Sequence, residues 1–317
     1  MIAVDELQAS SIRRAHGMID PSFTGSPQFV HEGLSERLGV PVIVKIETVN
    51  PIRSFKGRGT WVAVSALAAA GSIGADRPIV CVSAGNFGQG VAYAARALGV
   101  PAIIFAGLRA NPAKVARMRA LGANVIQAGE AFDDARAASE TYAIEHDAEL
   151  LVDGQDPMIS AGAATMALEV TDAVGAGSLP TPAVVSVPVG NGALIIGIGS
   201  WMRTEAPSCQ IIGIQAEAAP SMALSWRGGR PIDTESAATY ADGIATRIAI
   251  PRAVELMSGR VDDMLLASEE ALRAAQAELT IELGITVEGA AAASWAGLLA
   301  GPRPHGPALV IITGSNA

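Results

Sequence analysis

One lysine, Lys56, stands in the segment SFKGRG (residues 54–59), directly after an apolar run that predicts a β-strand. The small residues around it predict a turn that opens a helix. A lysine in the first turn of a helix lies near the positive end of the helix dipole, which favours the neutral amine. A neutral amine is a nucleophile that can form a Schiff base with a carbonyl compound. The segment therefore indicates a reactive lysine in preference to an ordinary exposed one.

Three further loops with unusual residues also follow apolar runs. They are SAGNFGQG (83–90), VPVGNGAL (187–194) and TGSN (313–316). Glycine, asparagine and serine are common turn and cap residues, so each loop alone has an ordinary explanation. Together they are informative, because ligands of parallel α/β sheets bind in the loops at the carboxyl ends of the strands. These loops and SFKGRG are therefore the candidate site.

The glycine loop predicts a phosphate site. Gly190 and Gly192 let the backbone turn tightly and expose amide groups at the start of a helix. One interpretation is a dinucleotide site with Glu217 on the ribose, although the spacing from Gly192 to Gly197 departs from GxGxxG. The other is a smaller phosphate ester such as pyridoxal phosphate, which needs a lysine.

The elements that must position these loops alternate along the chain. Short apolar, β-branched runs predict strands, and alanine-rich segments between most of them predict helices. This order predicts mainly parallel sheets covered by helices. The predicted strands lie within residues 41–49, 78–85, 101–107, 123–129, 149–154, 183–190, 210–217 and 308–314, and the clearest helices within 59–71, 89–99 and 268–284.

Composition limits the kinds of molecule that the protein is expected to bind. The chain has 317 residues, is 50% hydrophobic and carries a formal charge of −9, which argues against nucleic acid or an anionic membrane as a partner. Cys81 and Cys209 lie far apart in apolar runs, which predicts reduced thiols and a cytoplasmic protein. The N-terminus lacks the pattern of a secretory signal, and prolines break the long uncharged stretch 173–202.

Taken together, the motifs resemble the fold-type II pyridoxal-phosphate enzymes, in the branch of serine/threonine dehydratases and serine racemase. The resemblance implies a two-domain α/β fold like that of the tryptophan synthase β subunit, and a homodimer. It places the large cofactor-binding domain at residues 1–73 and 154–317, and the small domain with the substrate carboxylate loop at 74–153. The segments that carry it are SFKGRG, SAGNFGQGVAYAA, LGANV, VPVGNGALIIGI, IIGIQAE, ADGIA, VEGAAAASWAGLL and IITGSN.

The resemblance also implies roles for single residues. Lys56 looks like the lysine that forms the Schiff base with pyridoxal phosphate. Thr313 matches the hydroxyl residue beside the pyridine nitrogen, which makes the cofactor a moderate electron sink and favours β-elimination over transamination. The implied cofactor contacts are Lys56, Phe55, Asn86, Gly190, Asn191, Gly192, Ala193, Leu194 and Thr313. The implied substrate contacts are Ser83, Ala84, Gly85, Asn86 and Gln89.

Departures from the family pattern narrow the expected activity. Racemases of the family carry a second serine where this chain has Ala84, so we expect a lyase rather than a racemase. Relatives that bind a divalent cation have carboxylates where this chain has Gln215 and Ser221, and Glu217 is out of register, so we expect no metal. Phe87 replaces a common histidine, with an effect on specificity that the sequence leaves open. Because the sequence ends after TGSN, we expect no regulatory domain and no feedback control by isoleucine through one.

The predicted function is therefore a pyridoxal-phosphate-dependent ammonia-lyase that eliminates the hydroxyl of serine or threonine and yields a 2-keto acid and ammonia. Asn191 and Ala193 stand where the family's phosphate loop has glycines. We therefore expect a phosphate loop of the same general form but with an altered shape. The alternatives are a β-replacement enzyme of the cysteine-synthase type, a dinucleotide-binding oxidoreductase, and a non-catalytic binding protein that kept the fold.

Overall fold

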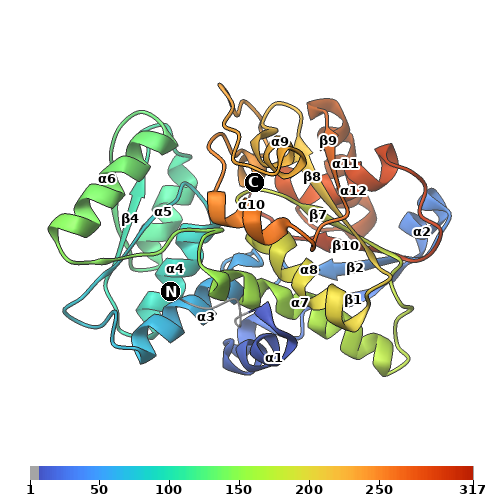
Figure 1. Ribbon diagram of the computed structural model, residues 1–317, viewed down its shortest axis with the longest axis horizontal. Helices are drawn as coiled ribbons and strands as arrows, with labels where there is room; N and C mark the ends of the chain where they lie inside the picture. The colour runs from blue at the N-terminus through green and yellow to red at the C-terminus, as the bar shows by residue number, and fades with distance from the viewer. Residues whose placement is uncertain (1–6, 317) are drawn as a thin grey trace.

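Two sheets of mostly parallel strands organise the chain (Figure 1). The computed structural model describes residues 7–316. The larger sheet has six strands in the order β1-β2-β10-β7-β8-β9, with β1 antiparallel to β2 and the other pairs parallel. The smaller sheet has four parallel strands in the order β5-β4-β3-β6. The prediction of mainly parallel sheets is confirmed.

The strands are short and the helices connect them. The strands are β1 (Gln28–His31), β2 (Val42–Ile46), β3 (Ile79–Val82), β4 (Ala102–Ala106), β5 (Asn124–Gln127), β6 (Glu149–Leu150), β7 (Val184–Pro188), β8 (Gln210–Ala216), β9 (Asp263–Ala267) and β10 (Ala308–Ile312). The α-helices are α1 (Ala9–Met18), α2 (Glu32–Leu38), α3 (Lys56–Ala69), α4 (Asn86–Ala97), α5 (Pro112–Ala120), α6 (Phe132–Glu145), α7 (Pro157–Gly175), α8 (Ala193–Glu205), α9 (Ser221–Gly228), α10 (Pro251–Met257), α11 (Glu269–Leu283) and α12 (Gly289–Ala300), with 3-10 turns η2 (Pro21–Phe23) and η3 (Asp242–Ile244).

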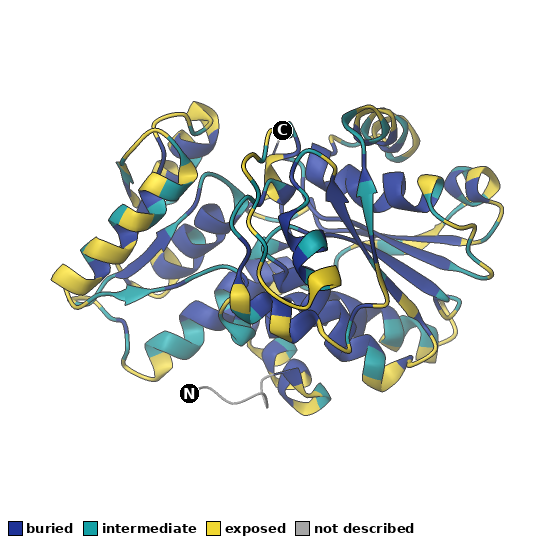
Figure 2. Ribbon diagram, turned by 45° about the horizontal axis from the view of Figure 1, so that its top comes forward, coloured by how far each residue is buried: buried dark blue, intermediate teal, exposed yellow. Residues whose placement is uncertain are grey.

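The central strands of the larger sheet are apolar on both faces, because successive side chains of a strand alternate between two buried layers. In β10, Leu309 packs in the layer that contains α1, α7 and α8, whereas Val310 packs with α2, α11 and α12. Figure 2 shows the dark blue, buried strands enclosed between helices whose outer faces are exposed. The apolar runs in the sequence thus reflect burial from both sides.

The smaller sheet repeats this arrangement. Ile104 of β4 packs against α4 and α5, while its neighbours Ile103 and Phe105 pack against α6. In Figure 1 this sheet and its helices form the left part of the molecule. Within residues 7–316, no helix is both long and apolar enough to span a bilayer.

Helix α3, which begins at Lys56, is held tightly against α7. A Cβ atom on Gly59 would lie 2.5 Å from the carbonyl oxygen of Ile159, and one on Gly162 would lie 2.6 Å from the Cα of Gly59. Such distances leave no room for a side chain, so the glycines allow the two backbones to touch. The start of α3 is therefore fixed relative to the larger sheet.

Each of the eight predicted strands is present, and two strands were missed. The missed strand β1 lies at an edge and exposes Phe29 and Val30, so it lacks the apolar run of a buried strand. The missed strand β9 also lies at an edge and begins with the exposed Asp263. The strands of the smaller sheet all fall within residues 74–153, but the division into two domains stays a prediction.

Candidate active site

A cavity of about 450 Å³ lies where strands of both sheets end. The loops after β3, β7 and β10 contribute to its wall through Ser83, Gly190 and Thr313. All the predicted site residues line this cavity except Gln89. Its volume is within the range typical of small-molecule sites.

Lys56 is the first residue of α3 and reaches the cavity wall. Its Nζ lies 2.6 Å from Oδ2 of Asp153, and 5.1 and 5.7 Å from the ring centres of Phe55 and Phe87. The turn before Lys56 is fixed to the end of β10, because the amide of Phe55 donates to the carbonyl of Thr313 at 3.0 Å. The amine is therefore held between one carboxylate and two aromatic rings.

The loop after β3 presents unused backbone donors. The hydroxyl oxygen of Ser83 accepts hydrogen bonds from the amides of Gly85 at 3.1 Å and of Gly88, in the first turn of α4, at 2.8 Å. In the described part of the chain, the amides of Ala84, Asn86 and Phe87 have no hydrogen-bond acceptor. Unpaired amides at a helix N-terminus attract an anion, as the predicted carboxylate loop requires.

Asn86 belongs to a polar network that the sequence did not reveal. Its Nδ2 donates to both carboxylate oxygens of Glu288 at 3.0 Å, and its Oδ1 accepts from Nδ2 of Asn316 at 2.8 Å. Burial raises the pKa of the Glu288 carboxyl; the hydrogen bond from Asn86 opposes this, and the nearby Asp242 carboxylate adds to it. The VEGAAAA segment was part of the resemblance, but nothing in it indicated this contact.

The glycine loop forms an uncapped helix start. Gly192 has φ +96° and precedes α8, while a Cβ on Gly190 would lie 2.5 Å from the carbonyl oxygen of Gly243. Asn191 and Ala193 have negative φ, so neither replacement of a family glycine strains the backbone. Within residues 7–316, the amides of Gly192, Ala193 and Leu194 have no acceptor.

These features fit pyridoxal phosphate. The uncapped amides of α8 suit a phosphate, and the close approach at Gly190 leaves no space for a side chain in that cradle. Lys56 lies in the same cavity, as does Thr313, whose hydroxyl has no partner in the described part of the chain. The residues present thus include an amine, an anion site and a free hydroxyl, which match the aldehyde, phosphate and ring nitrogen of this cofactor.

Gln89 lies elsewhere. Its side chain is fully buried in α4, and both of its polar atoms lack partners among the described residues. Glu217, the residue proposed for a dinucleotide, does not line the cavity either, and Gly197 packs against the carbonyl of Ser160 in the middle of α8. The geometry therefore does not favour the dinucleotide interpretation.

Charged pairs join elements of the two sheets around the cavity. Lys114 of α5 pairs with Asp242 of η3, and Nε of Arg247 donates to Asp133 of α6 at 2.6 Å. Lys114 also lines the cavity, so Lys56 is not the only lysine there. These pairs hold the segment around residues 242–247 against α5 and α6.

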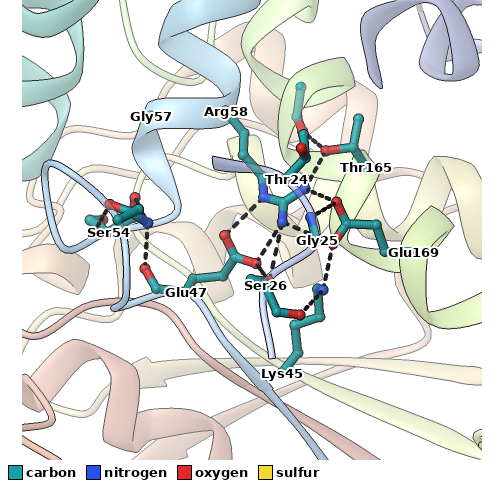
Figure 3. Close-up of polar contacts among 12 residues, drawn as sticks. Thr24, Gly25, Ser26, Lys45, Glu47, Ser54, Gly57, Arg58, Thr165 and Glu169 are labelled. Atoms are coloured by element: carbon teal, nitrogen blue, oxygen red, sulfur yellow. Dashed lines mark hydrogen bonds and ion pairs between the residues drawn. The ribbon is translucent and has the colours of Figure 1, made fainter. Parts of the chain in front are cut away.

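A buried group of charges surrounds Arg58, two residues after Lys56 in the sequence (Figure 3). The guanidinium of Arg58 contacts Glu47 through Nε at 2.8 Å and Glu169 through Nη1 at 2.7 Å, and Nζ of Lys45 lies 2.5 Å from Glu169. All four charges are buried, and positive and negative groups balance. This cluster links β2, α3 and α7, and we call it the Arg58 cluster.

The Glu169 carboxyl should make the free energy of unfolding depend on pH. Burial by itself raises the pKa of Glu169, but the hydrogen bonds and charges of Arg58 and Lys45 outweigh it and lower the pKa from 4.5 to about 2. A carboxyl with a lowered folded pKa stabilises the protein above its unfolded pKa, and this stability is lost as the pH falls from 4.5 towards 2. By about pH 3 the loss should be about 2 kcal/mol.

Urea unfolding near neutral pH and near pH 3 measures this loss, with Glu169→Gln as the reference that cannot titrate at this position. The wild-type protein should lose about 2 kcal/mol more than the variant on acidification. Equal losses in the two proteins would show that Glu169 does not contribute.

Metal ligands are not grouped in the described residues. Within residues 7–316, no three His, Cys, Asp or Glu side chains lie close enough to hold an ion. At the two positions where metal-binding relatives have carboxylates, the side chains are used for other hydrogen bonds. Oε1 of Gln215 accepts from the amide of Ala223 at 2.9 Å, and the Ser221 hydroxyl donates to the carbonyl of Thr246 at 2.8 Å. The expectation of no metal stays a prediction.

A cavity lysine and a glycine turn with unpaired amides, on an α/β fold of mainly parallel sheets, are the features expected of a pyridoxal-phosphate enzyme. A family model described as "Pyridoxal-phosphate dependent enzyme" matches residues 19–314. The chain belongs to this family.

Individual relatives are similar over most of the chain. The L-threonine ammonia-lyase of Geobacter sulfurreducens is 35% identical over 265 residues, covering 84% of this chain and 64% of the relative. That of Thermotoga maritima is 35% identical over 284 residues, covering 89% and 69%. The chain thus spans about two thirds of the length of these curated relatives.

Solved structures agree on the fold. A threonine deaminase from the organism abbreviated T.th. superimposes with a TM-score of 0.89 at 29% identity and covers 98% of each chain. Maize serine racemase has a TM-score of 0.89 at 24% identity, with 98% of this chain and 94% of that chain covered, and shows the shared fold alone. The predicted family, fold class and cofactor are confirmed, and the names of the curated relatives support the predicted lyase class.

Proposed function

We propose that the protein is a pyridoxal-phosphate-dependent ammonia-lyase that converts L-serine or L-threonine to a 2-keto acid and ammonia. The observation that carries the proposal is the meeting of Lys56 with the unpaired amides of two helix starts, α4 and α8, in one cavity. When bound, the cofactor supplies the electron-withdrawing group that makes the Cα proton of an amino acid acidic.

The protein supplies positioning and proton transfer. The amides of Ala84, Asn86 and Phe87, with the Ser83 hydroxyl, bind the substrate carboxylate, and the Lys56 amine removes the Cα proton. Loss of that proton and of the β-hydroxyl removes one water molecule. The released product then hydrolyses to the keto acid and ammonia.

The cofactor would be held mostly by residues in loops of the larger sheet, together with Asn86 from the loop after β3 of the smaller sheet. Lys56 would form the Schiff base, the amides of the glycine loop would bind the phosphate, and Thr313 would face the ring nitrogen. The proposed contacts are Phe55, Lys56, Asn86, Gly190, Asn191, Gly192, Ala193, Leu194 and Thr313. We further propose residues 1–73 and 154–317 as the large domain and 74–153 as the small one, which is supported by the span of the four-stranded sheet.

Elimination is favoured over the alternatives. Ala84 carries no acid or base, so the loop that binds the carboxylate cannot support racemisation as a second serine would. A β-replacement enzyme would need a sulfur nucleophile to trap the product before it leaves.

We also propose a homodimer in the cytoplasm; the free, buried Cys81 and Cys209 support a reducing compartment.

The direct test is a substrate panel on the purified protein loaded with pyridoxal phosphate. We expect keto acid from L-serine and L-threonine, little D-serine from L-serine, and no cysteine from O-acetylserine and sulfide. Rapid interconversion of L- and D-serine would instead identify a racemase, and cysteine formation a β-replacement enzyme. Gel filtration with light scattering tests the dimer.

A further inference from the structure

Asp153 is a cavity carboxylate to which the proposed reaction assigns no role. It lies in the turn between β6 and α7, and its Oδ2 is 2.6 Å from Nζ of Lys56. Its side chain is only 12% exposed, and it lines the cavity. Sequence reasoning did not select it, because it stands 97 residues from Lys56 in a short, ordinary turn.

One oxygen of this carboxylate has no partner. Oδ1 is buried and accepts no hydrogen bond from any residue of the described chain, whereas Oδ2 accepts from Lys56 and, at 3.5 Å, from Nδ2 of Asn191. A buried, unpaired carboxylate oxygen is costly. Because the Asp153 side chain lines the cavity, a rotation of the carboxylate would turn this unsatisfied oxygen towards a ligand group that donates a hydrogen bond.

The geometry of the proposed reaction brings the substrate's β-substituent to this oxygen. To lose its proton to Lys56, the substrate Cα must come within about 3.5 Å of Nζ. The β-carbon is one bond further, and its substituent one bond beyond that. A carboxylate that lies 2.6 Å from Nζ is therefore within reach of the β-substituent.

Charge decides which end of the substrate faces Asp153. The substrate carboxylate is repelled by Asp153 and attracted by the unpaired amides after β3. The substrate therefore lies with its carboxylate towards Ser83 and its β-substituent towards Asp153. A hydroxyl or ammonium group there can donate to the Asp153 carboxylate, whereas a chloride or an ester cannot.

We propose that Asp153 is a specificity-determining residue, which accepts a hydrogen bond from the substituent on the substrate's β-carbon. It selects amino acids with a β-hydroxyl or β-ammonium group over those whose leaving group lacks a donor. The assignment rests on the proposed function. It adds a reason why elimination from hydroxy amino acids is favoured over β-replacement, whose substrates carry ester leaving groups.

The test compares L-serine, 2,3-diaminopropionate and β-chloroalanine in the wild-type protein and in Asp153→Asn. We expect kcat/KM to fall about 10- to 100-fold for the first two, because each loses a bond to a charged acceptor, and less than about 3-fold for β-chloroalanine. An equal loss for all three overturns the proposal, because Asp153 would then act on Lys56 alone. An unchanged rate with serine overturns it as well.

Controls separate this proposal from folding and from the proposed function. The circular dichroism spectrum of the cofactor-free protein should be the same in wild type, Asp153→Asn and the exposed-site control Asp76→Asn, which tests that both variants fold. If Asp153→Asn fails to fold, Asp153→Ser with the same three substrates gives the answer. If the wild-type protein eliminates from none of them, the proposed function fails; if only the selective loss is missing, this inference alone fails.

Discussion

Replacing Lys56 with alanine is expected to lower turnover of serine or threonine by about 1,000-fold or more, because the substitution removes both the nucleophile and the base. It should also abolish covalent retention of the cofactor. Borohydride reduction followed by mass spectrometry of the peptides measures this directly. In the wild-type protein the peptide that contains Lys56 should gain the mass of the cofactor.

Two variants serve as controls for this result. Lys56→Arg keeps a cation beside Asp153, at 2.6 Å in the wild type, but cannot retain the cofactor covalently. Lys114→Ala removes the other cavity lysine, which pairs with Asp242, and should still retain the cofactor at Lys56. Labelling of Lys114 in the wild type, or full retention in Lys56→Ala, would contradict the assignment.

Replacing Arg58 with methionine is expected to reduce the free energy of unfolding by about 3 to 5 kcal/mol. Arg58 is fully buried, and its removal leaves Glu47 and Glu169 without their main positive partner. Charges buried without partners are destabilising because water is absent to solvate them. Urea unfolding near neutral pH measures the change.

Arg37→Met is the matched control for Arg58→Met. Arg37 pairs with Glu278 at 3.4 Å, and its side chain is 60% exposed, so its loss should cost at most about 1 kcal/mol. A similar small cost for Arg58 would mean that the Arg58 cluster is easily hydrated or rearranged. Since Arg58 is two residues from Lys56, we also expect Arg58→Met to slow turnover.

The sequence predicted which loops line the cavity, for a physical reason. Apolar runs mark strands buried on both faces, and ligands of parallel sheets bind in the loops at the carboxyl ends of such strands. Ser83, Gly190 and Thr313 could therefore be placed in one site before their spatial neighbours were known. The edge strands β1 and β9 were missed because an exposed strand needs no apolar run.

For the glycine loop, the local sequence predicted the kind of structure but not its details. Its role as an uncapped helix start followed from composition, because glycine permits turns and leaves amides free. The sequence did not predict which residue of the loop has a positive φ angle. The structure places it on Gly192 and leaves Asn191 free to contact Asp153 and Thr246 with its side chain.

By itself, the sequence determined the order of strands and helices and the loops that line the cavity with Lys56, because these depend on local spacing and burial. Only the tertiary structure decided the partners of those residues: Asp153 beside Lys56, Glu288 beside Asn86, and Glu169 beside Arg58. The members of these pairs stand 97, 202 and 111 residues apart. Packing of the two sheets brings them together, and a charge or amide carries no local signal of the distant group that it will meet.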